Sequence, residues 1–363
     1  MGISFLIPLK KGGIKRKKIC HNIFSEIISL ENLFLAWNEF KRGKTKRFDV
    51  QQFEFNLEDN IFQLYQELKN KTYKHSEYAS FFVQDPKLRH IHKAQVRDRI
   101  VHHLISQHFN NIYNETFIYD SYSCRLNKGT HRAIERLNRF SFLMSRNNTR
   151  NFYALKCDIR KFFDSIDHNI LIAILTKRIK DSDFLWLISE IIDSFEKFNN
   201  KGIPLGNLTS QYFANIYLNE LDKFVKHKLK IKYYIRYMDD FVILDNNRDY
   251  LGKITDSIEK FLSDNLKLSL HPDKILIKKH QQGVDFLGYI TLPHCRILRT
   301  KTKKRIFKRI KDKINDFKNG EISRESLNQA IQSYLGVLSH CDSHKLKKLL
   351  ENKTGFQSYI SIL

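Results

Sequence analysis

The stretch Tyr233-Tyr234-Ile235-Arg236-Tyr237-Met238-Asp239-Asp240-Phe241-Val242-Ile243-Leu244 places two adjacent carboxylates between two apolar, aromatic runs. Val, Ile, Tyr and Phe favour strands, and neither run contains Pro or Gly. The stretch therefore predicts a β-hairpin with Asp239 and Asp240 at its tip. Because successive side chains of a strand point to opposite faces, we expect one carboxylate to dominate the chemistry. Such a pair alone is typical either of a solvated turn or of a site where a cation neutralises like charges.

A second acidic centre lies upstream, where the run from Phe152 to Cys157 predicts a short strand that ends at Asp158. The carboxyl ends of strands are where α/β folds place ligand-handling groups. Asp158 and Asp239 on neighbouring strands could hold two Mg²⁺ ions about 3.5 to 4 Å apart, an arrangement suited to phosphoryl transfer. The alternative is that Asp158 caps the following helix.

Four blocks of the sequence resemble those of prokaryotic reverse transcriptases. In chain order they are Asp158 to Asp164, Gly202 to Gln211, Tyr237 to Asp240, and the primer-grip block Gly283 to Tyr289. Order and spacing match from about Leu88 to Tyr289, a far more specific signal than any single block. The resemblance implies an RNA-directed DNA polymerase with a right-hand α+β fold: fingers and palm with an antiparallel catalytic sheet, plus an α-helical thumb.

The resemblance also assigns roles to individual residues. It implies catalysis by Asp158, Asp239 and Asp240, with two Mg²⁺ ions held by Asp158, Ile159 and Asp239. It implies nucleotide binding by Arg125, Lys128, Phe163, Leu205, Gly206 and Lys274, and a primer grip at Phe286, Leu287 and Gly288. Backbone contacts by Lys304, Arg305, Lys308 and Arg309 are expected because this basic stretch would follow the template and primer without reading bases.

Three of these roles have a specific physical content. An aromatic ring at Phe163 would clash with a 2′-hydroxyl and so select dNTPs, while Phe162 is expected in the core. Lys274 is a candidate proton donor to pyrophosphate. Arg125 and Lys128 would clamp the triphosphate, although without the resemblance both look like ordinary surface charges.

The block from Gly202 to Gln211 departs from the family pattern. Leu205 replaces the usual Gln, and Gln211 the usual Pro. This variant resembles the reverse transcriptases of diversity-generating retroelements, which make errors at template adenines. An apolar side chain at position 205 offers no hydrogen bond to orient the nucleotide, so we expect low fidelity. The alternative is that Leu205 simply packs.

Composition favours a polyanionic partner. Sixty-three Lys and Arg against 39 Asp and Glu give a net charge of +24, whereas solubility requires only about 2 to 8 in a small domain. The five cysteines form no C-x-x-C pair and predict reduced thiols in a cytoplasmic protein. No apolar run approaches the ~20 residues that would span a membrane.

Patterning divides the chain into a basic N-terminal extension (1–56), fingers and palm (57–290) and a helical thumb (291–363). Residues 1–56 are poorly patterned, and clusters at Lys15 to Lys18 and Lys41 to Arg47 could hold template RNA. Helices are predicted near 57–68, 96–105, 214–225, 254–261, 301–318 and 327–338, and a hairpin near 81–91 with a turn at Asp85-Pro86. Thr130 could cap a helix that follows it.

Other functions remain open from the sequence. The enzyme could be a host-defence or group II intron-type reverse transcriptase, or a catalytically silent RNA-binding scaffold. The basic stretch from Lys301 to Lys318 also fits a helix lying on a membrane, which explains none of the four blocks. Expected partners are template RNA, primer, cDNA and dNTPs; the diversity-generating resemblance adds a small basic helical accessory protein that assembles as an oligomer.

Overall fold

The computed structural model describes residues 20–84 and 87–354, so the Lys15 to Lys18 cluster and the Asp85-Pro86 turn lie outside the described residues. Contacts between Cα atoms divide the chain into two compact units. The first unit contains residues up to 116 together with 166–217, and the second contains 117–165 together with the chain from 218 onward. The division into extension, fingers and palm, and thumb remains a prediction.

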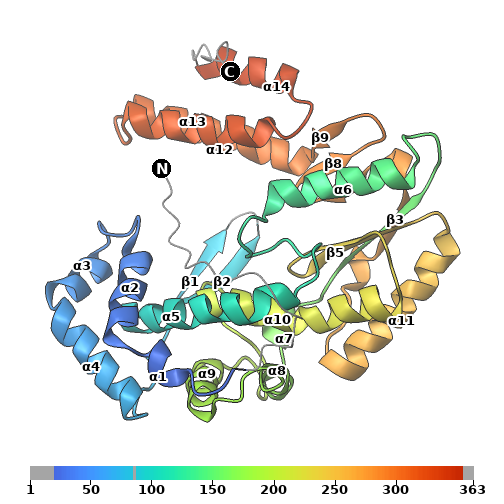
Figure 1. Ribbon diagram of the computed structural model, residues 1–363. Helices are drawn as coiled ribbons and strands as arrows, with labels where there is room; N and C mark the ends of the chain where they lie inside the picture. Colours follow the sequence, from blue (N-terminus) through green and yellow to red (C-terminus); the bar gives the residue numbers. More distant parts are fainter. Residues whose placement is uncertain (1–19, 85–86, 355–363) are drawn as a thin grey trace, which may run out of the picture. The chain divides into compact units, whose positions relative to one another are not determined.

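Helices form most of the first unit (Figure 1). They are α1 (Phe24–Ile27), α2 (Leu30–Lys41), α3 (Phe48–Phe55), α4 (Leu57–Lys69), α5 (Val96–Tyr113), α8 (His168–Leu175), α9 (Ser182–Asp193) and the start of α10 (Leu208–Lys223), with a short 3-10 turn at Asn114–Thr116. The predicted hairpin is confirmed as β1 (Ala79–Gln84) paired antiparallel with β2 (Leu88–Lys93). The helices predicted near 57–68 and 96–105 are confirmed as α4 and α5.

The segment that looked poorly patterned contains three helices, α1, α2 and α3, between Phe24 and Phe55. Leu33, Ala36, Trp37 and Phe40 of α2 are all buried, at the i, i+3, i+4, i+7 spacing of an amphipathic helix. Abundant lysines masked this periodicity. The helix contacts α4 and α5, so the region contributes to the core of the first unit.

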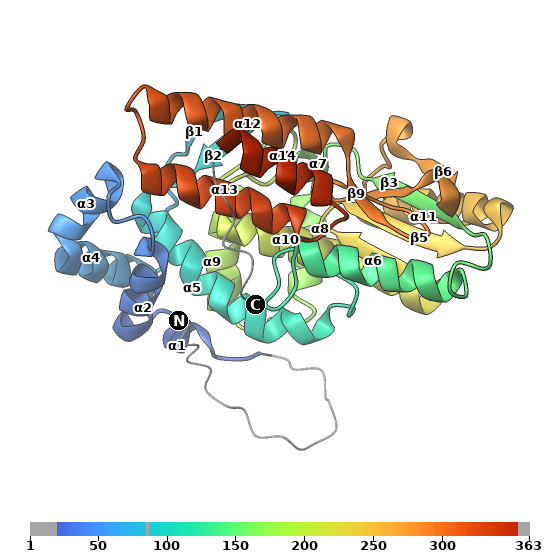
Figure 2. The same cartoon turned by 90° about the horizontal axis from the view of Figure 1, so that it is seen from above.

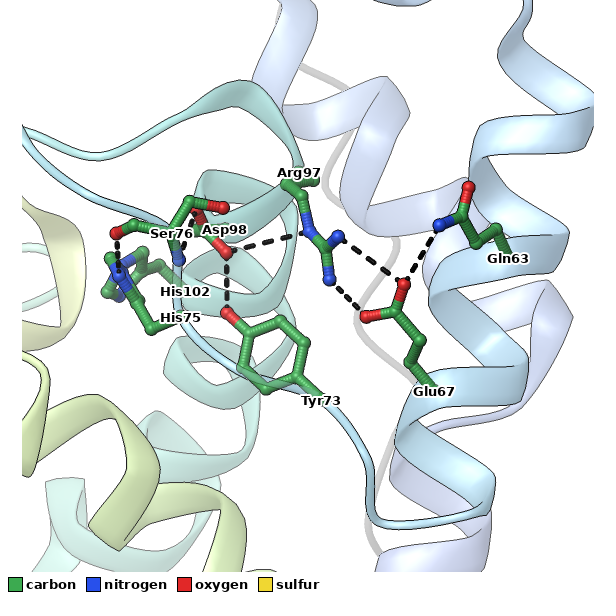
Figure 3. A network of polar contacts seen from close by, with 8 residues as sticks. All are labelled: Gln63, Glu67, Tyr73, His75, Ser76, Arg97, Asp98 and His102. Atoms are coloured by element: carbon green, nitrogen blue, oxygen red, sulfur yellow. Dashed lines mark hydrogen bonds and ion pairs between the residues drawn. The ribbon is translucent and has the colours of Figure 1, made fainter.

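A buried polar network joins α4, α5 and the segment between them (Figure 3). The Tyr73 hydroxyl donates to Asp98 Oδ1 at 2.7 Å, and the Ser76 N–H donates to Oδ2 at 3.3 Å. Arg97 of α5 forms an ion pair with Glu67 of α4. Asp98 and Tyr73 are fully buried, so these bonds replace the water that the carboxylate loses on folding.

The same network fixes the protons of two histidines. His75 Nδ1 lies 2.6 Å from the Ser76 carbonyl, which can only accept, so Nδ1 carries the proton. His102 Nε2 therefore donates to His75 Nε2 at 3.1 Å, and His102 Nδ1 accepts from the Thr209 hydroxyl at 2.6 Å. Burial holds the pKa of His102 well below its ordinary value, and burial also lowers the pKa of His75. Both rings are therefore neutral, and the buried His102 ring has a structural role in this network.

The second unit is built on a four-stranded antiparallel sheet in the order β4-β5-β3-β6. Figure 2 labels β3, β5 and β6 of this sheet. The strands are β3 (Tyr153–Asp158), β4 (Tyr234–Tyr237), β5 (Asp240–Asp245) and β6 (Leu276–Lys279). Val242 and Leu244 of β5 pack with residues of α6 (Thr130–Met144) in one core cluster. Phe241 and Ile243 are also buried and face the other side, and α11 (Arg248–Leu266) contacts this strand.

Helix α6 begins differently from the prediction. Its N-cap is Gly129, with φ +115°, and no side chain caps it. Thr130 is the first helical residue, and its hydroxyl lies 3.3 Å from the Tyr237 hydroxyl. The cap assigned to Thr130 is therefore wrong, because glycine supplies the positive φ at this turn.

A small sheet and a helical segment complete the second unit. Its elements are β7 (Val284–Phe286), β8 (Tyr289–Thr291), β9 (Arg296–Leu298), α12 (Thr300–Lys318), α13 (Arg324–Leu338) and α14 (His344–Thr354). Short elements elsewhere in this unit are α7 (Phe162–Ser165), the end of α10, a π-helix (Phe224–Lys228) and two 3-10 turns (Pro272–Lys274, His280–Gln282). Ile306 and Ile310 of α12 pack with Leu327, Ile331 and Leu335 of α13, which confirms the two predicted C-terminal helices.

Within residues 20–84 and 87–354, none of the helices has the length and apolar character needed to cross a membrane.

We predict that Tyr73→Phe lowers the free energy of unfolding by about 1 to 3 kcal/mol, because the buried Asp98 carboxylate loses a hydrogen bond that water cannot replace. Urea unfolding measures this change. Tyr65→Phe on α4 is the control: Tyr65 is only partly buried, and a change within about 0.5 kcal/mol is expected. Equal losses in the two variants would contradict the role given to the Tyr73 hydroxyl.

Candidate active site

The predicted acidic hairpin is confirmed. Strands β4 and β5 pair antiparallel, with Tyr237 opposite Asp240, so Met238 and Asp239 form the two-residue turn. Met238 has φ +56°, a left-handed conformation that a non-glycine residue adopts only when its surroundings enforce it. The turn is thus held in a conformation that its own sequence does not favour.

Asp158 joins the two hairpin carboxylates. It ends β3, as predicted, and its register partner on β5 is Asp240. The Ile159 N–H donates to the Asp239 carbonyl at 3.2 Å, which fixes the chain after β3 to the hairpin turn. Three aspartates from two segments more than 80 positions apart in the sequence therefore meet at one end of the sheet.

Asp240 is the carboxylate whose ionisation the site disfavours. The pKa of Asp240 is raised to about 7, chiefly by burial and further by the charges of Asp158 and Asp239. The Lys156 ammonium, 3.5 Å from Asp240 Oδ2, opposes this shift but does not cancel it. Asp240 Oδ1 is buried and has no hydrogen-bond partner among the described residues. A site with excess negative charge and an unsatisfied carboxylate oxygen favours a cation.

A lysine ammonium already neutralises Asp158. Lys274, in the 3-10 turn Pro272–Lys274, places its Nζ 2.6 Å from Asp158 Oδ1. The His271 N–H donates to the Asp158 carbonyl at 2.8 Å, which holds this turn against the end of β3. Lys274 thus lies directly beside the carboxylates, and a divalent ion on Asp158 would compete with its ammonium.

The donor set fits Mg²⁺ with help from other ligands. Across the described part of the chain, no group of three or more His, Cys, Asp or Glu side chains is arranged to hold a metal ion unaided, so the three aspartates lie at the same end of the sheet without forming a complete site. Mg²⁺ usually takes one or two carboxylates and completes its shell with water and substrate phosphates. Asp158, Asp239 and the Ile159 carbonyl match that smaller requirement.

A buried ion pair beneath the hairpin escaped sequence analysis. Arg236 of β4 and Asp222 of α10 are fully buried, with Nε and Nη2 of the arginine 2.7 and 2.6 Å from the two carboxylate oxygens. The Tyr234 hydroxyl donates to the same carboxylate at 2.7 Å, and Arg236 Nη1 donates to the Met238 carbonyl at 3.1 Å. The pair therefore anchors the strained turn. An arginine inside an otherwise apolar strand was the available signal.

The two cations predicted to clamp a triphosphate have partners within the second unit. Arg125 Nη1 donates to the carbonyls of Ile118 and Ser121 at 2.7 and 2.9 Å. Lys128 Nζ donates to the Tyr119 carbonyl at 2.8 Å and lies 3.4 Å from the centre of that ring. Both side chains order their own loop, and a role in nucleotide binding remains a prediction.

The two phenylalanines of α7 differ in burial. Phe162 is buried, and Phe163 beside it is only partly buried, with the rings 5.5 Å apart in an edge-to-face arrangement. The expected core position of Phe162 is confirmed. Phe163 keeps exposed ring surface five positions after Asp158.

The predicted primer grip is a tight turn. Phe286 of β7 is buried in the core, and Leu287 and Gly288 connect it to β8 with positive φ angles of 51° and 90°. Leu287, Gly288, Lys128 and Arg305 line one cavity of about 640 Å³ in the second unit. The cavity thus gathers residues that sequence analysis assigned separately to the primer, the nucleotide and the backbone.

The four residues predicted to contact the nucleic-acid backbone lie on α12. Lys304 and Lys308 are exposed, and Arg305 and Arg309 are partly buried. Ile306 and Ile310 occupy the buried side of this helix, so the cationic side is separate from the packed one.

The block Gly202 to Gln211, whose sequence departs from the family pattern, is hydrogen-bonded to β2 within the first unit. The His92 N–H donates to the Leu205 carbonyl at 2.9 Å, and Asn207 Nδ2 donates to the His92 carbonyl at 2.8 Å. Gly206 has φ +114°, and a Cβ there would lie 2.8 Å from Ile91 Cγ2. Glycine is thus required at position 206, and the Leu205 side chain is left partly exposed.

Comparison with known proteins identifies a family. The model described as "Reverse transcriptase (RNA-dependent DNA polymerase)" matches residues 73–291, more than half of the chain. The group II intron-encoded protein LtrA of Lactococcus lactis subsp. cremoris is 25% identical over 346 residues, which cover 76% of this chain and 54% of that protein. Protein YkfC of Escherichia coli K12 is 26% identical over 241 residues, covering 56% and 63% respectively.

The chain therefore spans less than two thirds of the length of these curated relatives. Among solved structures, apo telomerase from Candida tropicalis aligns with a TM-score of 0.49 and 12% identity, over 64% of this chain and 50% of that chain.

We predict that Lys274→Met tightens Mn²⁺ binding about fivefold, because the metal no longer competes with the ammonium; a partly exposed ion pair contributes roughly 1 kcal/mol. Titration calorimetry measures the affinity. Lys278→Met, an exposed lysine on β6, is the control and should change it less than about twofold. Weaker binding by Lys274→Met would show that the lysine supports the metal instead of competing with it.

Proposed function

Because the chain belongs to the reverse transcriptase (RNA-dependent DNA polymerase) family, and so has the right-hand polymerase fold that the resemblance predicted, we propose that it synthesises DNA on an RNA template. The observation that carries the proposal is the gathering of Asp158, Asp239 and Asp240 within the matched residues, with an unsatisfied buried oxygen on Asp240. The net charge of +24 supports a nucleic-acid substrate.

In the proposed reaction the primer 3′-hydroxyl attacks the α-phosphate of a dNTP, and pyrophosphate leaves. Asp158, Asp239 and the Ile159 carbonyl would hold two Mg²⁺ ions, which activate the hydroxyl and stabilise the leaving oxygen when bound. Asp240, opposite Asp158 on the neighbouring strand, would add negative charge that attracts the metal ions. Most of the catalytic effect comes from positioning and charge stabilisation.

Two side chains near the carboxylates complete the proposal. Lys274, whose ammonium is within 2.6 Å of Asp158, would donate a proton to the departing pyrophosphate. Phe163, partly exposed on α7, would exclude ribonucleotides by contact with the 2′-hydroxyl. The basic side of α12 and the turn Leu287–Gly288 would hold the template-primer backbone.

The subtype rests on one block of sequence. Leu205 and Gln211 favour an error-prone enzyme of a diversity-generating retroelement, acting with an oligomeric basic accessory protein in the cytoplasm. The name of the relative LtrA favours the other candidate, a group II intron-type enzyme. Fidelity separates the two.

Primer extension on an RNA template with Mg²⁺ tests the proposed activity. We predict that Asp239→Asn lowers the rate about 100-fold or more, because charge stabilisation at the reacting phosphate is lost. Asp245→Asn, at the other end of β5, is the control and should retain activity. Extension by Asp239→Asn at the wild-type rate would reject the assignment.

Sequencing of the cDNA tests the subtype. We predict that Leu205→Gln lowers misincorporation opposite template adenines about twofold to tenfold, because the added amide contributes one orienting hydrogen bond. Leu205→Met keeps the apolar side chain and serves as the control. A faithful wild-type enzyme, or an unchanged error spectrum in Leu205→Gln, would contradict the error-prone subtype.

A further inference from the structure

The turn formed by Leu205 and Gly206, two residues expected to bind the nucleotide, is attached to β2 within the first unit. The His92 N–H donates to the Leu205 carbonyl at 2.9 Å. A Cβ on Gly206 would lie 2.8 Å from Ile91 Cγ2, so the glycine lies directly against the strand. Leu205 is partly exposed and Gly206 is exposed, so the turn is accessible on its other side.

The side chain of Asn207 supplies two further attachments of this turn. Its Nδ2 donates to the His92 carbonyl at 2.8 Å, and its Oδ1 accepts from the Ala94 N–H at 3.2 Å. Because a carbonyl only accepts and an N–H only donates, these partners fix the orientation of the amide. Asn207 is 4% exposed. Sequence analysis assigned it no role.

An amide is the group that position 207 requires, because it must donate and accept at once. A carboxylate would accept from the Ala94 N–H but would repel the His92 carbonyl. An alanine would leave both backbone groups without these partners, and unpaired buried backbone groups are costly. The Asn207 amide therefore closes a ring between residues 92–94 and 205–207, which restricts the conformations open to the turn.

The alternative role for Asn207 is that of a helix cap. It directly precedes α10 (Leu208–Lys223), a position at which asparagine commonly caps a helix. The hydrogen bonds of its amide, however, run to β2 and to the residue that directly follows β2. The start of α10 has its own attachment, because the buried Thr209 hydroxyl donates to His102 Nδ1 at 2.6 Å. The amide of Asn207 thus acts on the turn before it.

We propose that Asn207 is a positioning residue for the incoming nucleotide. It holds the Leu205–Gly206 turn in the conformation that receives a dNTP, without touching the nucleotide itself. The proposal rests on the proposed function for its ligand. A turn that is ordered before binding does not have to be ordered by the nucleotide, so the nucleotide binds more tightly.

Binding of a dNTP to a complex that cannot react tests the proposal. The protein, an RNA template and a dideoxy-terminated primer are titrated with the next complementary dNTP, and the ternary complex that resists heparin is measured by gel shift. Asn207→Ala should raise the dissociation constant of the dNTP about fivefold or more, because binding must then order the turn.

Asn215→Ala is the matched control. Asn215 is 1% exposed, so it is at least as buried as Asn207, and it lies on α10 outside the block Gly202 to Gln211. A loss of stability alone lowers the fraction of folded protein and leaves the affinity of the remainder unchanged. Asn215→Ala should therefore change the dissociation constant less than about twofold. Equal increases in the two variants, or an unchanged constant in Asn207→Ala, would overturn the proposal.

Hydrogen exchange of the wild-type protein supplies a readout that needs no variant. The amides of His92 and Ala94 exchange when their bonds to Leu205 and Asn207 open. Addition of the dNTP to the terminated complex should slow both amides about fivefold or more, because the ligand stabilises the closed turn. Unchanged exchange at both amides would overturn the proposal.

Extension of an unterminated primer keeps this test separate from that of the proposed function. A wild-type protein that forms the dNTP-dependent complex but does not extend the primer would reject the polymerase activity and leave the positioning role standing. A protein that extends the primer while Asn207→Ala binds the dNTP normally would overturn the positioning role alone. A wild-type protein that forms no dNTP-dependent complex would also overturn the positioning role.

Discussion

Electrostatic repulsion among three carboxylates is the constraint on which the candidate site depends. The sheet register places Asp158 opposite Asp240, and the hairpin turn adds Asp239 to the same end. The charges of the other two aspartates, together with burial, raise the pKa of Asp240 to about 7. This repulsion destabilises the folded protein unless opposite charge offsets it. A bound divalent cation is the simplest source of that charge. Lys274 and Lys156 supply part of that neutralisation within the protein.

A buried ion pair between Arg236 and Asp222 supports the hairpin that carries this site. Arg236 and Asp222 form a fully buried ion pair, whose desolvation is costly unless its hydrogen bonds are satisfied. Here they are satisfied by Tyr234 and by the Met238 carbonyl. Because Met238 has a left-handed backbone, we interpret the ion pair as the element that holds the turn, and so Asp239, in place.

Local sequence predicted the acidic hairpin, the strand before Asp158 and the helices α4 to α6 and α10 to α13, because apolar periodicity reports burial directly. The sequence did not reveal partners that are distant along the chain. Lys274 with Asp158, and Arg236 with Asp222, required the fold itself. Helix α2 was missed although Leu33, Ala36, Trp37 and Phe40 have helical spacing, because the flanking lysines dominated the pattern. Gly129, and not Thr130, is the N-cap of α6. The turn requires a positive φ, which glycine adopts easily, and no hydroxyl caps the helix.

The proposed function depends above all on one property, the joint binding of divalent metal by Asp158 and Asp239. Anomalous diffraction from crystals of the protein with Mn²⁺, an RNA-DNA template-primer and a non-reactive dNTP analogue tests it most directly. We predict Mn²⁺ density within coordination distance of both carboxylates and of the nucleotide phosphates. Carboxylates that point apart, or Mn²⁺ bound to only one of them, would contradict the account.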